Sequence, residues 1–183
     1  ASDVYKRQGW SLKQLHRVII CSSTYRQSSY TTQELHARDP DNRRQFAATY
    51  GPRFGIEIEP VETPRAAIDG ADVIIGATNT NVPLFNGDWL VAGQHVTGII
   101  GSNIQLVQGG FLKQRRREID DKTAARADIV VANLRDSVLS EQQGDLFEPI
   151  ERGLIAAEDI VDLGDVARGA VPGRTSADQI TYH

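Results

Sequence analysis

The chain has 183 residues, 40% of them hydrophobic and 24% charged, which is sufficient for one domain with a hydrophobic core. Its formal net charge of −4 gives no reason to expect nucleic acid or an anionic membrane as a partner, and no apolar run is long enough to cross a bilayer. The single cysteine, Cys21, excludes an internal disulfide framework and predicts a cytoplasmic protein.

The first part of the chain differs from the rest. Its first eight residues, ASDVYKRQ, resemble the translation of a sequencing adapter, and the chain contains no methionine. A β-branched run at residues 17–21 could be a strand, but residues 22–33 are rich in serine and threonine and lack periodicity. We therefore expect residues 1–35 to be an artefactual or disordered segment of a fragment.

Regular patterns follow this segment. A helix is predicted over residues 42–50, with Phe46 and Ala47 on its buried side and Pro52 just beyond its end. Residues 56–61 begin with Ile-Glu-Ile-Glu, and this alternation predicts an edge strand with one exposed face.

A second helix and two strands come next. Thr63 followed by Pro64 predicts an N-cap and the first helical position of a short helix, which Gly70 ends. Residues 71–78 are mostly apolar, which predicts a strand covered by helices on both faces. Residues 94–100 predict another strand.

Helices and strands continue to alternate in the C-terminal half. A helix over residues 118–127 and a strand over 128–134 precede a helical region, 136–153, with a break near Gly144. Residues 154–169 are predicted to be largely helical, and the chain then closes in a turn-rich segment. This order predicts an α/β fold with a Rossmann-like, doubly wound parallel sheet, incomplete at its N-terminal end.

Small polar residues follow two of the predicted strands, at the edge where parallel sheets bind ligands. They are Thr78, Asn79 and Thr80 after the first strand, and Gly101, Ser102 and Asn103 after the second. Short side chains let a flat ring approach the backbone, and their hydroxyls and amides can bind ribose or carboxamide groups. They could equally be ordinary turn residues, but clusters at two matching strand ends favour a ligand.

A glycine-rich phosphate loop is absent from the expected place, because residues 10–50 contain no glycine. Cradling a pyrophosphate needs backbone amides close to it, and side chains at those positions obstruct the approach. Either the protein binds no dinucleotide, or this segment of the sequence is corrupted or missing.

Several ordered stretches from about His36 to His183 carry a family resemblance. They include ADVIIGATNTNVPLFNGDWL, REIDDKTAARADIVVANLRDSV and DLGDVARGAVPGRTSADQIT. These stretches resemble the ornithine cyclodeaminase/mu-crystallin family. The resemblance implies that residues 36–183 are an NAD(P)-binding domain, that the substrate-binding and dimerisation domain is missing, and that the full-length parent is a homodimeric enzyme. It also implies that the phosphate loop has been lost rather than replaced.

The resemblance assigns roles to individual residues. Arg38 lies where family members select the adenosine ribose, and an arginine there can pair with a 2′-phosphate, which favours NADP over NAD. A solvated surface arginine is the alternative reading of Arg38. Further cofactor contacts are expected at Thr78, Asn79, Thr80, Ile100, Gly101 and Ser102.

Asn103 is the candidate catalytic residue and also departs from the family pattern. Cyclodeaminases of the family carry an aspartate at this position, and an amide cannot act as a general base. A reductase or dehydrogenase that acts on an amino acid or cyclic imine by hydride transfer at the α-carbon, with the proton coming from another group, fits Asn103 at least as well as an ornithine cyclodeaminase-like ammonia-lyase does. The alternatives are a mu-crystallin-like protein that binds NADPH and a small ligand, and a fragment inactive by itself.

Other polar residues are interpreted as structural. Glu118, Asp120 and Asp121 begin a predicted helix, where negative charge complements the helix dipole. His95 is expected to pack in the core, and Arg174 to position the final turn. The histidines show no metal-ligand spacing, so no metal is expected.

Overall fold

A computed structural model describes residues 43–78, 82–99 and 102–183. The chain divides into two compact units, Ala1–Pro60 and Val61–His183. The predicted strand at 17–21 and the predicted site residues Arg38, Asn79, Thr80, Ile100 and Gly101 lie outside the described residues.

Helix α4 (Arg43–Phe54) is the described element of the first unit, and it corrects two predictions. Pro52 lies inside its last turn, and the helix ends at Gly55, which has φ of 65°. Phe46 was predicted to be buried but is 55% exposed, and its ring packs along the helix against Tyr50, with ring centroids 4.6 Å apart.

The edge strand predicted over residues 56–61 is not formed. The backbone N–H of Ile56 instead donates to the carbonyl of Gly51, 3.1 Å away, which turns the chain back onto the end of α4. An alternating pattern forms a strand only when a neighbouring strand supplies hydrogen-bond partners, and no described strand pairs with this segment.

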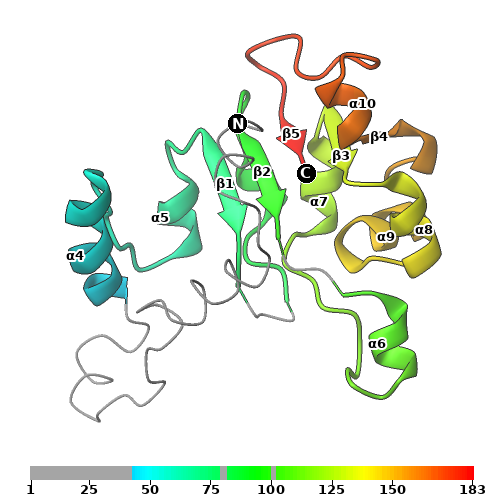
Figure 1. Ribbon diagram of the computed structural model, residues 1–183, viewed down its shortest axis with the longest axis horizontal. Coiled ribbons are helices and arrows are strands. Elements are labelled where there is room, and N and C mark those ends of the chain that lie inside the picture. Colours follow the sequence, from blue (N-terminus) through cyan, green and yellow to red (C-terminus); the bar gives the residue numbers. More distant parts are fainter. Residues whose placement is uncertain (1–42, 79–81, 100–101) are drawn as a thin grey trace, which may run out of the picture. The chain divides into compact units, whose positions relative to one another are not determined.

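The second unit contains a five-stranded parallel sheet, which confirms the predicted α/β class (Figure 1). Its strands are β1 (Val73–Gly76), β2 (His95–Gly98), β3 (Ile129–Ala132), β4 (Ile160–Asp162) and β5 (Thr181–Tyr182). Their order across the sheet is β1-β2-β5-β3-β4, and all pairs are parallel. The last strand in the sequence therefore lies in the middle of the sheet, next to β2 and β3.

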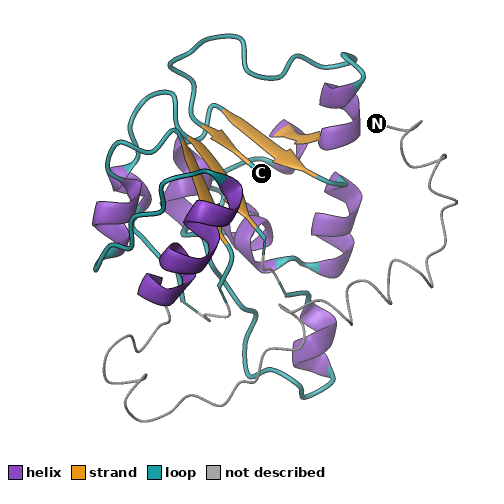
Figure 2. Ribbon diagram, turned by 60° about the vertical axis from the view of Figure 1, so that its left-hand side comes forward, coloured by secondary structure: helices purple, strands orange, loops and turns teal. Residues whose placement is uncertain are grey.

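Helices and short 3-10 turns connect these strands (Figure 2). They are α5 (Pro64–Ile68), η1 (Gly87–Trp89), α6 (Ile104–Gln108), α7 (Asp121–Arg126), α8 (Arg135–Glu141), α9 (Gly144–Glu151), η2 (Ala157–Asp159) and α10 (Leu163–Ala167). The predicted break near Gly144 is confirmed by the separation of α8 from α9. Of the helices in the described ranges, none has the length and apolar character that crossing a membrane requires.

The prediction of a largely helical segment over residues 154–169 was wrong in its middle, where β4 lies. The turn-rich C-terminal segment likewise contains β5. Both strands are too short for their sequence to show a period of two, and they become strands because β3 supplies backbone partners on either side.

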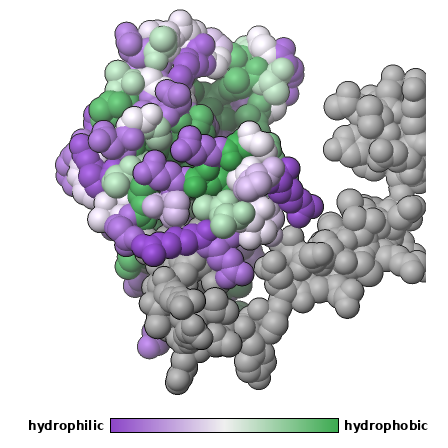
Figure 3. Space-filling model, turned by 90° about the vertical axis from the view of Figure 1, so that its left-hand side faces the viewer, coloured by the Kyte–Doolittle hydropathy of each residue, from purple (hydrophilic) through white to green (hydrophobic). Residues whose placement is uncertain are grey.

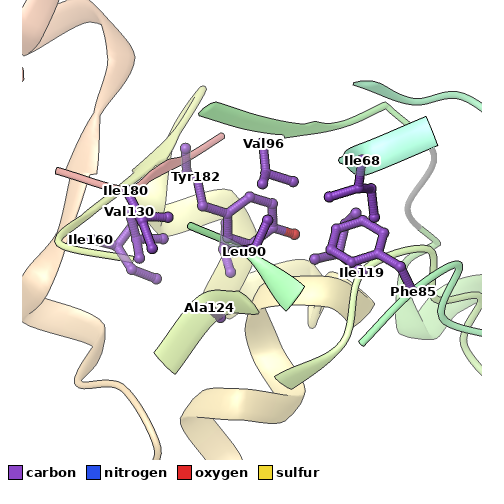
Figure 4. Packing of buried hydrophobic residues seen from close by; sticks show 12 residues of the cluster. Ile68, Phe85, Leu90, Val96, Ile119, Ala124, Val130, Ile160, Ile180 and Tyr182 are labelled. Carbon is purple, nitrogen blue, oxygen red and sulfur yellow. The ribbon is translucent and has the colours of Figure 1, made fainter. Parts of the chain in front are cut away.

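The core lies against one face of the sheet. Val96 of β2 and Tyr182 of β5 point from the sheet toward Leu90 and Ala124 (Figure 4), and all four side chains are buried. This packing joins α7 and the segment after η1 to the sheet.

The other face of β1 is uncovered among the described residues. Val73 is 56% exposed and Ile75 61% exposed, whereas Ile74 between them packs against the core. The prediction that helices cover both faces of this strand is therefore wrong for the part of the chain that the structure describes. Hydrophobic side chains also lie among hydrophilic ones on the face shown in Figure 3.

The predicted N-cap of α5 is confirmed, because Oγ1 of Thr63 accepts a hydrogen bond from the backbone N–H of Ala66 at 3.2 Å. Thr63→Ala is expected to lower the free energy of unfolding by about 1 kcal/mol, since it leaves that N–H without its cap. Thr63→Ser, which keeps the hydroxyl, should unfold close to the parent in urea. Equal losses in both variants would contradict the capping role.

Candidate functional site

A cavity of about 300 Å³ lies at the carboxyl ends of β2, β5 and β3. Gly98 lines it at the end of β2, Asn133 just after β3, and Tyr182 and His183 at the end of β5. Ligands of parallel α/β sheets bind at this edge, and the volume lies at the lower end of the range for small-molecule sites. The cavity is therefore the candidate ligand site of the described chain.

Asp145 is placed at this cavity by the start of α9. A side chain at Gly144 is excluded there, because its Cβ would lie 2.6 Å from the carbonyl oxygen of Arg116. The close contact between Gly144 and Arg116 places Asp145 against the loop that precedes α7. There, Oδ1 of Asp145 accepts hydrogen bonds from the backbone N–H groups of Glu118 at 2.9 Å and Ile119 at 3.3 Å. These bonds hold the carboxylate in one orientation.

Two buried residues with polar side chains line the cavity. Asp145 is 8% exposed and Tyr182 2% exposed. A Cβ on Gly98 would lie 3.6 Å from Oδ2 of Asp145, 3.6 Å from the hydroxyl oxygen of Tyr182 and 3.2 Å from Cγ1 of Ile119. Glycine at the end of β2 therefore lets these three side chains pack closely against the strand.

The protonation of this pair is shifted by burial. Burial raises the pKa of Asp145 to about 6, although its bonds to the Glu118 and Ile119 amides and the nearby Arg117 guanidinium act in the opposite direction. Nε of Arg117 lies 3.7 Å from Oδ1 of Asp145. Burial and then the charge of Asp145 raise the pKa of Tyr182 well above its usual value.

Thr78 and Ser102 follow β1 and β2, which are adjacent and parallel, so both residues lie at the carboxyl edge of the sheet. The backbone N–H of Thr78 donates to the carboxylate of Glu118, which is 1% exposed. Glu118 precedes α7, and its side chain holds the end of β1 in place. The contact of Thr78 with a cofactor stays a prediction.

Ser102 is buried and bonded within the protein. Its Oγ accepts the backbone N–H of Arg116, and its carbonyl accepts the N–H of Gly144 at 3.2 Å. Ser102 therefore holds together the segments that position Asp145. These bonds do not test the predicted contact of Ser102 with a cofactor, which stays a prediction.

Asn103 caps helix α6. Its Oδ1 accepts the backbone N–H of Leu106 at 3.3 Å, which explains why an amide is compatible with this position. Asn103 does not line the cavity among the described residues. Its catalytic role stays a prediction.

The structural role predicted for Asp120 is confirmed. Asp120 is the N-cap of α7, with Oδ1 accepting from Thr123 at 2.9 Å, while Oδ2 accepts the N–H of Gly87 at 2.9 Å. The carboxylate thus joins α7 to η1.

His95 and Arg174, which were also interpreted as structural, make internal bonds. The ring nitrogens of His95 lie 2.7 Å from Oγ1 of Thr181 and 2.8 Å from Oγ1 of Thr97. Arg174 donates to Thr181 at 3.2 Å and to the carbonyl of Gln94 at 3.3 Å, which ties the final turn to the sheet. Within the described ranges, no cluster of three or more histidine, cysteine or acidic residues could hold a metal ion.

Sequence reasoning missed Asp145 and Tyr182. The available signals were weak: an acidic residue directly after the glycine that begins a helix, and a tyrosine in a segment interpreted as turns. Because β5 was not among the predicted strands, neither residue was recognised as lying at the carboxyl edge of the sheet.

The parallel sheet, with its cavity at the carboxyl edge, defines a Rossmann-like domain of the type that binds nicotinamide nucleotides. The chain belongs to the ornithine cyclodeaminase/mu-crystallin family, whose family model matches residues 19–183. The resemblance seen in the sequence is thereby confirmed.

Individual relatives agree with this assignment. The chain is 36% identical over 148 residues to a proposed dehydrogenase of Rhizobium meliloti, covering 80% of this chain and 41% of that protein. It is 29% identical over 148 residues to a Delta(1)-pyrroline-2-carboxylate reductase of Bacillus cereus, covering 80% and 42%. The chain thus spans about two fifths of the length of these relatives.

A solved structure shows the same fold. The Delta(1)-pyrroline-2-carboxylate reductase of Thermococcus litoralis, in complex with NADH and L-proline, matches with a TM-score of 0.67 and 29% identity. The match covers 79% of this chain and 41% of that one.

Proposed function

We propose that this chain is the nicotinamide-nucleotide-binding part of an oxidoreductase that acts on an amino acid or cyclic imine by hydride transfer at the α-carbon. The observation that carries the proposal is the cavity at the carboxyl ends of β2, β5 and β3, which the buried residues Asp145 and Tyr182 help to line. The reductases among its relatives support the same reaction class.

The residues around the cavity fit the nicotinamide end of such a cofactor. When bound, the nucleotide supplies or accepts the hydride. The apolar side chains of Val131 and Leu146 line the cavity and would limit the access of water to a ring bound there. The oxygens of Asp145 and Tyr182 can accept N–H donors and so fix the orientation of a bound ring or substrate.

We propose that the chain prefers NADP to NAD, and this preference rests on Arg38 alone. A guanidinium can pair with the 2′-phosphate in two hydrogen bonds, whereas NAD carries no phosphate there. Direct titration of the chain with NADH and NADPH tests this point. Equal affinity for both cofactors would remove the Arg38 argument and leave the rest of the proposal intact.

The proposed function predicts that the chain, supplied within the full-length parent protein, oxidises NADPH or NADH when Delta(1)-pyrroline-2-carboxylate is added. Absorbance of the reduced cofactor measures this directly. A cyclodeaminase would instead release ammonia from an amino acid with no net change in cofactor, so an ammonia assay with ornithine is run in parallel. Failure to bind either cofactor would refute the proposal.

A second candidate is a non-catalytic NADPH and small-ligand binding protein of the mu-crystallin kind. Asn103 favours it, because the position that carries an aspartate in cyclodeaminases is used here to cap α6. Tight NADPH binding without turnover of any amino acid or imine would select this candidate over the first.

A further inference from the structure

We propose that Glu118 is a positioning residue for the nicotinamide-nucleotide site, where it holds Thr78 at the end of β1 and Asp145 at the cavity in one geometry. That a nicotinamide nucleotide is the ligand rests on the proposed function. The place of Glu118 between the end of β1 and the cavity rests on the contacts of described residues.

The carboxylate of Glu118 is buried against the end of β1. The residue is 1% exposed, and its carboxylate accepts a hydrogen bond from the backbone N–H of Thr78. A Cβ on Gly76 would lie 3.1 Å from Oε2 and 3.2 Å from Cδ of Glu118, so the carboxylate lies close to the strand backbone. Burial of a carboxylate is costly unless hydrogen bonds compensate for it, and a bond to a charged acceptor is strong. The contact therefore holds Thr78 firmly.

The backbone of Glu118 makes two further hydrogen bonds. Its carbonyl accepts the N–H of Leu84 at 2.9 Å, and its N–H donates to Oδ1 of Asp145 at 2.9 Å. Asp145 lines the cavity at the carboxyl ends of β2, β5 and β3. Glu118 therefore connects the end of β1 to the cavity through hydrogen bonds.

Thr78 lies just beyond the part of β1 that pairs with its neighbour. The register between β1 and β2 ends at Gly76 and Gly98, so Glu118 and not strand pairing binds the backbone N–H of Thr78. Ligands of parallel sheets bind at this edge, and residues that touch a ligand must be held in place before it arrives. A buried carboxylate at this point therefore fits a positioning role.

Glu118→Ala tests this role, because it removes the carboxylate but keeps the backbone bonds to Leu84 and Asp145. The full chain is titrated with NADPH and NADH, and binding is followed by nicotinamide fluorescence. The Kd of the preferred cofactor should rise about 10-fold, since the end of β1 is no longer held. A general loss of stability leaves the Kd unchanged as long as the variant is predominantly folded.

Glu118→Gln is the conservative variant. Its amide oxygen can still accept the N–H of Thr78, so it should restore most of the affinity that Glu118→Ala loses. Glu158→Ala, which removes an exposed glutamate of η2, is the matched control and should bind like the parent. An equal Kd in the parent and Glu118→Ala, or equal losses in Glu118→Ala and Glu118→Gln, would overturn the proposal.

Amide hydrogen exchange of the isotope-labelled chain, measured by nuclear magnetic resonance, gives a second readout that needs no cofactor. In Glu118→Ala the amide of Thr78 should exchange about 10-fold faster, because its acceptor is gone. The amide of Leu84 should stay protected, since its acceptor is a backbone carbonyl. Unchanged exchange at Thr78 would overturn the proposal.

Gly76→Ala replaces Glu118→Ala if that variant does not fold. Its methyl group would displace the Glu118 carboxylate and should raise the Kd of the cofactor in the same way. An unchanged Kd in Gly76→Ala would then overturn the proposal. Absence of cofactor binding to the parent counts against the proposed function, and the role of Glu118 falls with it. Binding that is unchanged in the variants counts against the role of Glu118 alone.

Discussion

Asp145 is expected to contribute about 3 kcal/mol to the free energy of unfolding at low pH and to lose that contribution as the pH rises from about 4 to above 6. Its pKa is about 6 in the folded protein, against about 3.9 for an aspartate in an unfolded chain. The folded state therefore binds the proton more tightly. The stabilisation is complete below the unfolded pKa and disappears as the pH passes through the folded one.

Urea unfolding of the parent and Asp145→Asn at several pH values between about 4 and 8 measures this contribution. Other groups titrate in the same range, so the informative quantity is the difference between parent and variant. We expect the parent to lose stability relative to Asp145→Asn as the pH rises. Asp136→Asn, which changes an exposed acid, should follow the parent. Parallel curves for the parent and Asp145→Asn would show that this carboxyl does not titrate near pH 6 in the folded state.

Gly87→Ala is expected to lower the free energy of unfolding by about 3 kcal/mol or more. A Cβ on Gly87 would lie 2.4 Å from the backbone nitrogen of Thr123 and 2.8 Å from Oδ1 of Asp120. These neighbours are backbone and a capping carboxylate, so α7 must move away from η1 to make room. That movement breaks the bonds through which Asp120 joins the two elements.

Gly164→Ala is the matched control for this substitution. Gly164 lies within α10, and the nearest atom to an added Cβ is the side-chain Nη1 of Arg168, 3.7 Å away. An alanine there should be neutral or stabilise the protein by about 0.5–1 kcal/mol, because alanine has the higher helix propensity. Thermal and urea unfolding of both variants compare the two sites. A loss below about 1 kcal/mol at Gly87 would contradict the tight packing of α7 against η1.

The correct predictions were those that depend on neighbouring residues. Thr63, Pro64 and Gly70 bound α5 as expected, and the break near Gly144 separates α8 from α9. Caps and stops act within a few residues of the chain, so the sequence displays them directly. The apolar runs that form β1, β2 and β3 could also be recognised as strands, because each is a pattern of contiguous residues.

The wrong predictions depended on distant partners. Residues 56–61 alternate like a strand but find no described neighbour to pair with, whereas the short segments of β4 and β5 become strands because β3 lies between them. Phe46 was assigned to a buried face, yet it packs against Tyr50 on the surface of α4. The hydrophobic pattern indicates which secondary structure a segment favours. Whether that structure forms depends on a packing or pairing partner that only the tertiary structure brings close.

The candidate site also contains residues that the sequence identified and residues that it did not. Thr78 and Ser102 were found because they follow two recognisable strands, and both lie at the expected edge of the sheet. Asp145 and Tyr182 come from elements distant from each other in the sequence, and their side chains approach each other beside Gly98. Nothing local distinguishes this aspartate from the capping Asp120.

By itself, the sequence determined the α/β class and the membership of the ornithine cyclodeaminase/mu-crystallin family, because caps, apolar runs and ordered motifs are properties of contiguous residues. Only the tertiary structure decided that β5 enters the middle of the sheet and that Asp145 and Tyr182 meet at one cavity. Both outcomes depend on burial and on backbone pairing between distant segments. Those interactions arise when the chain folds and have no counterpart in the local pattern of residues.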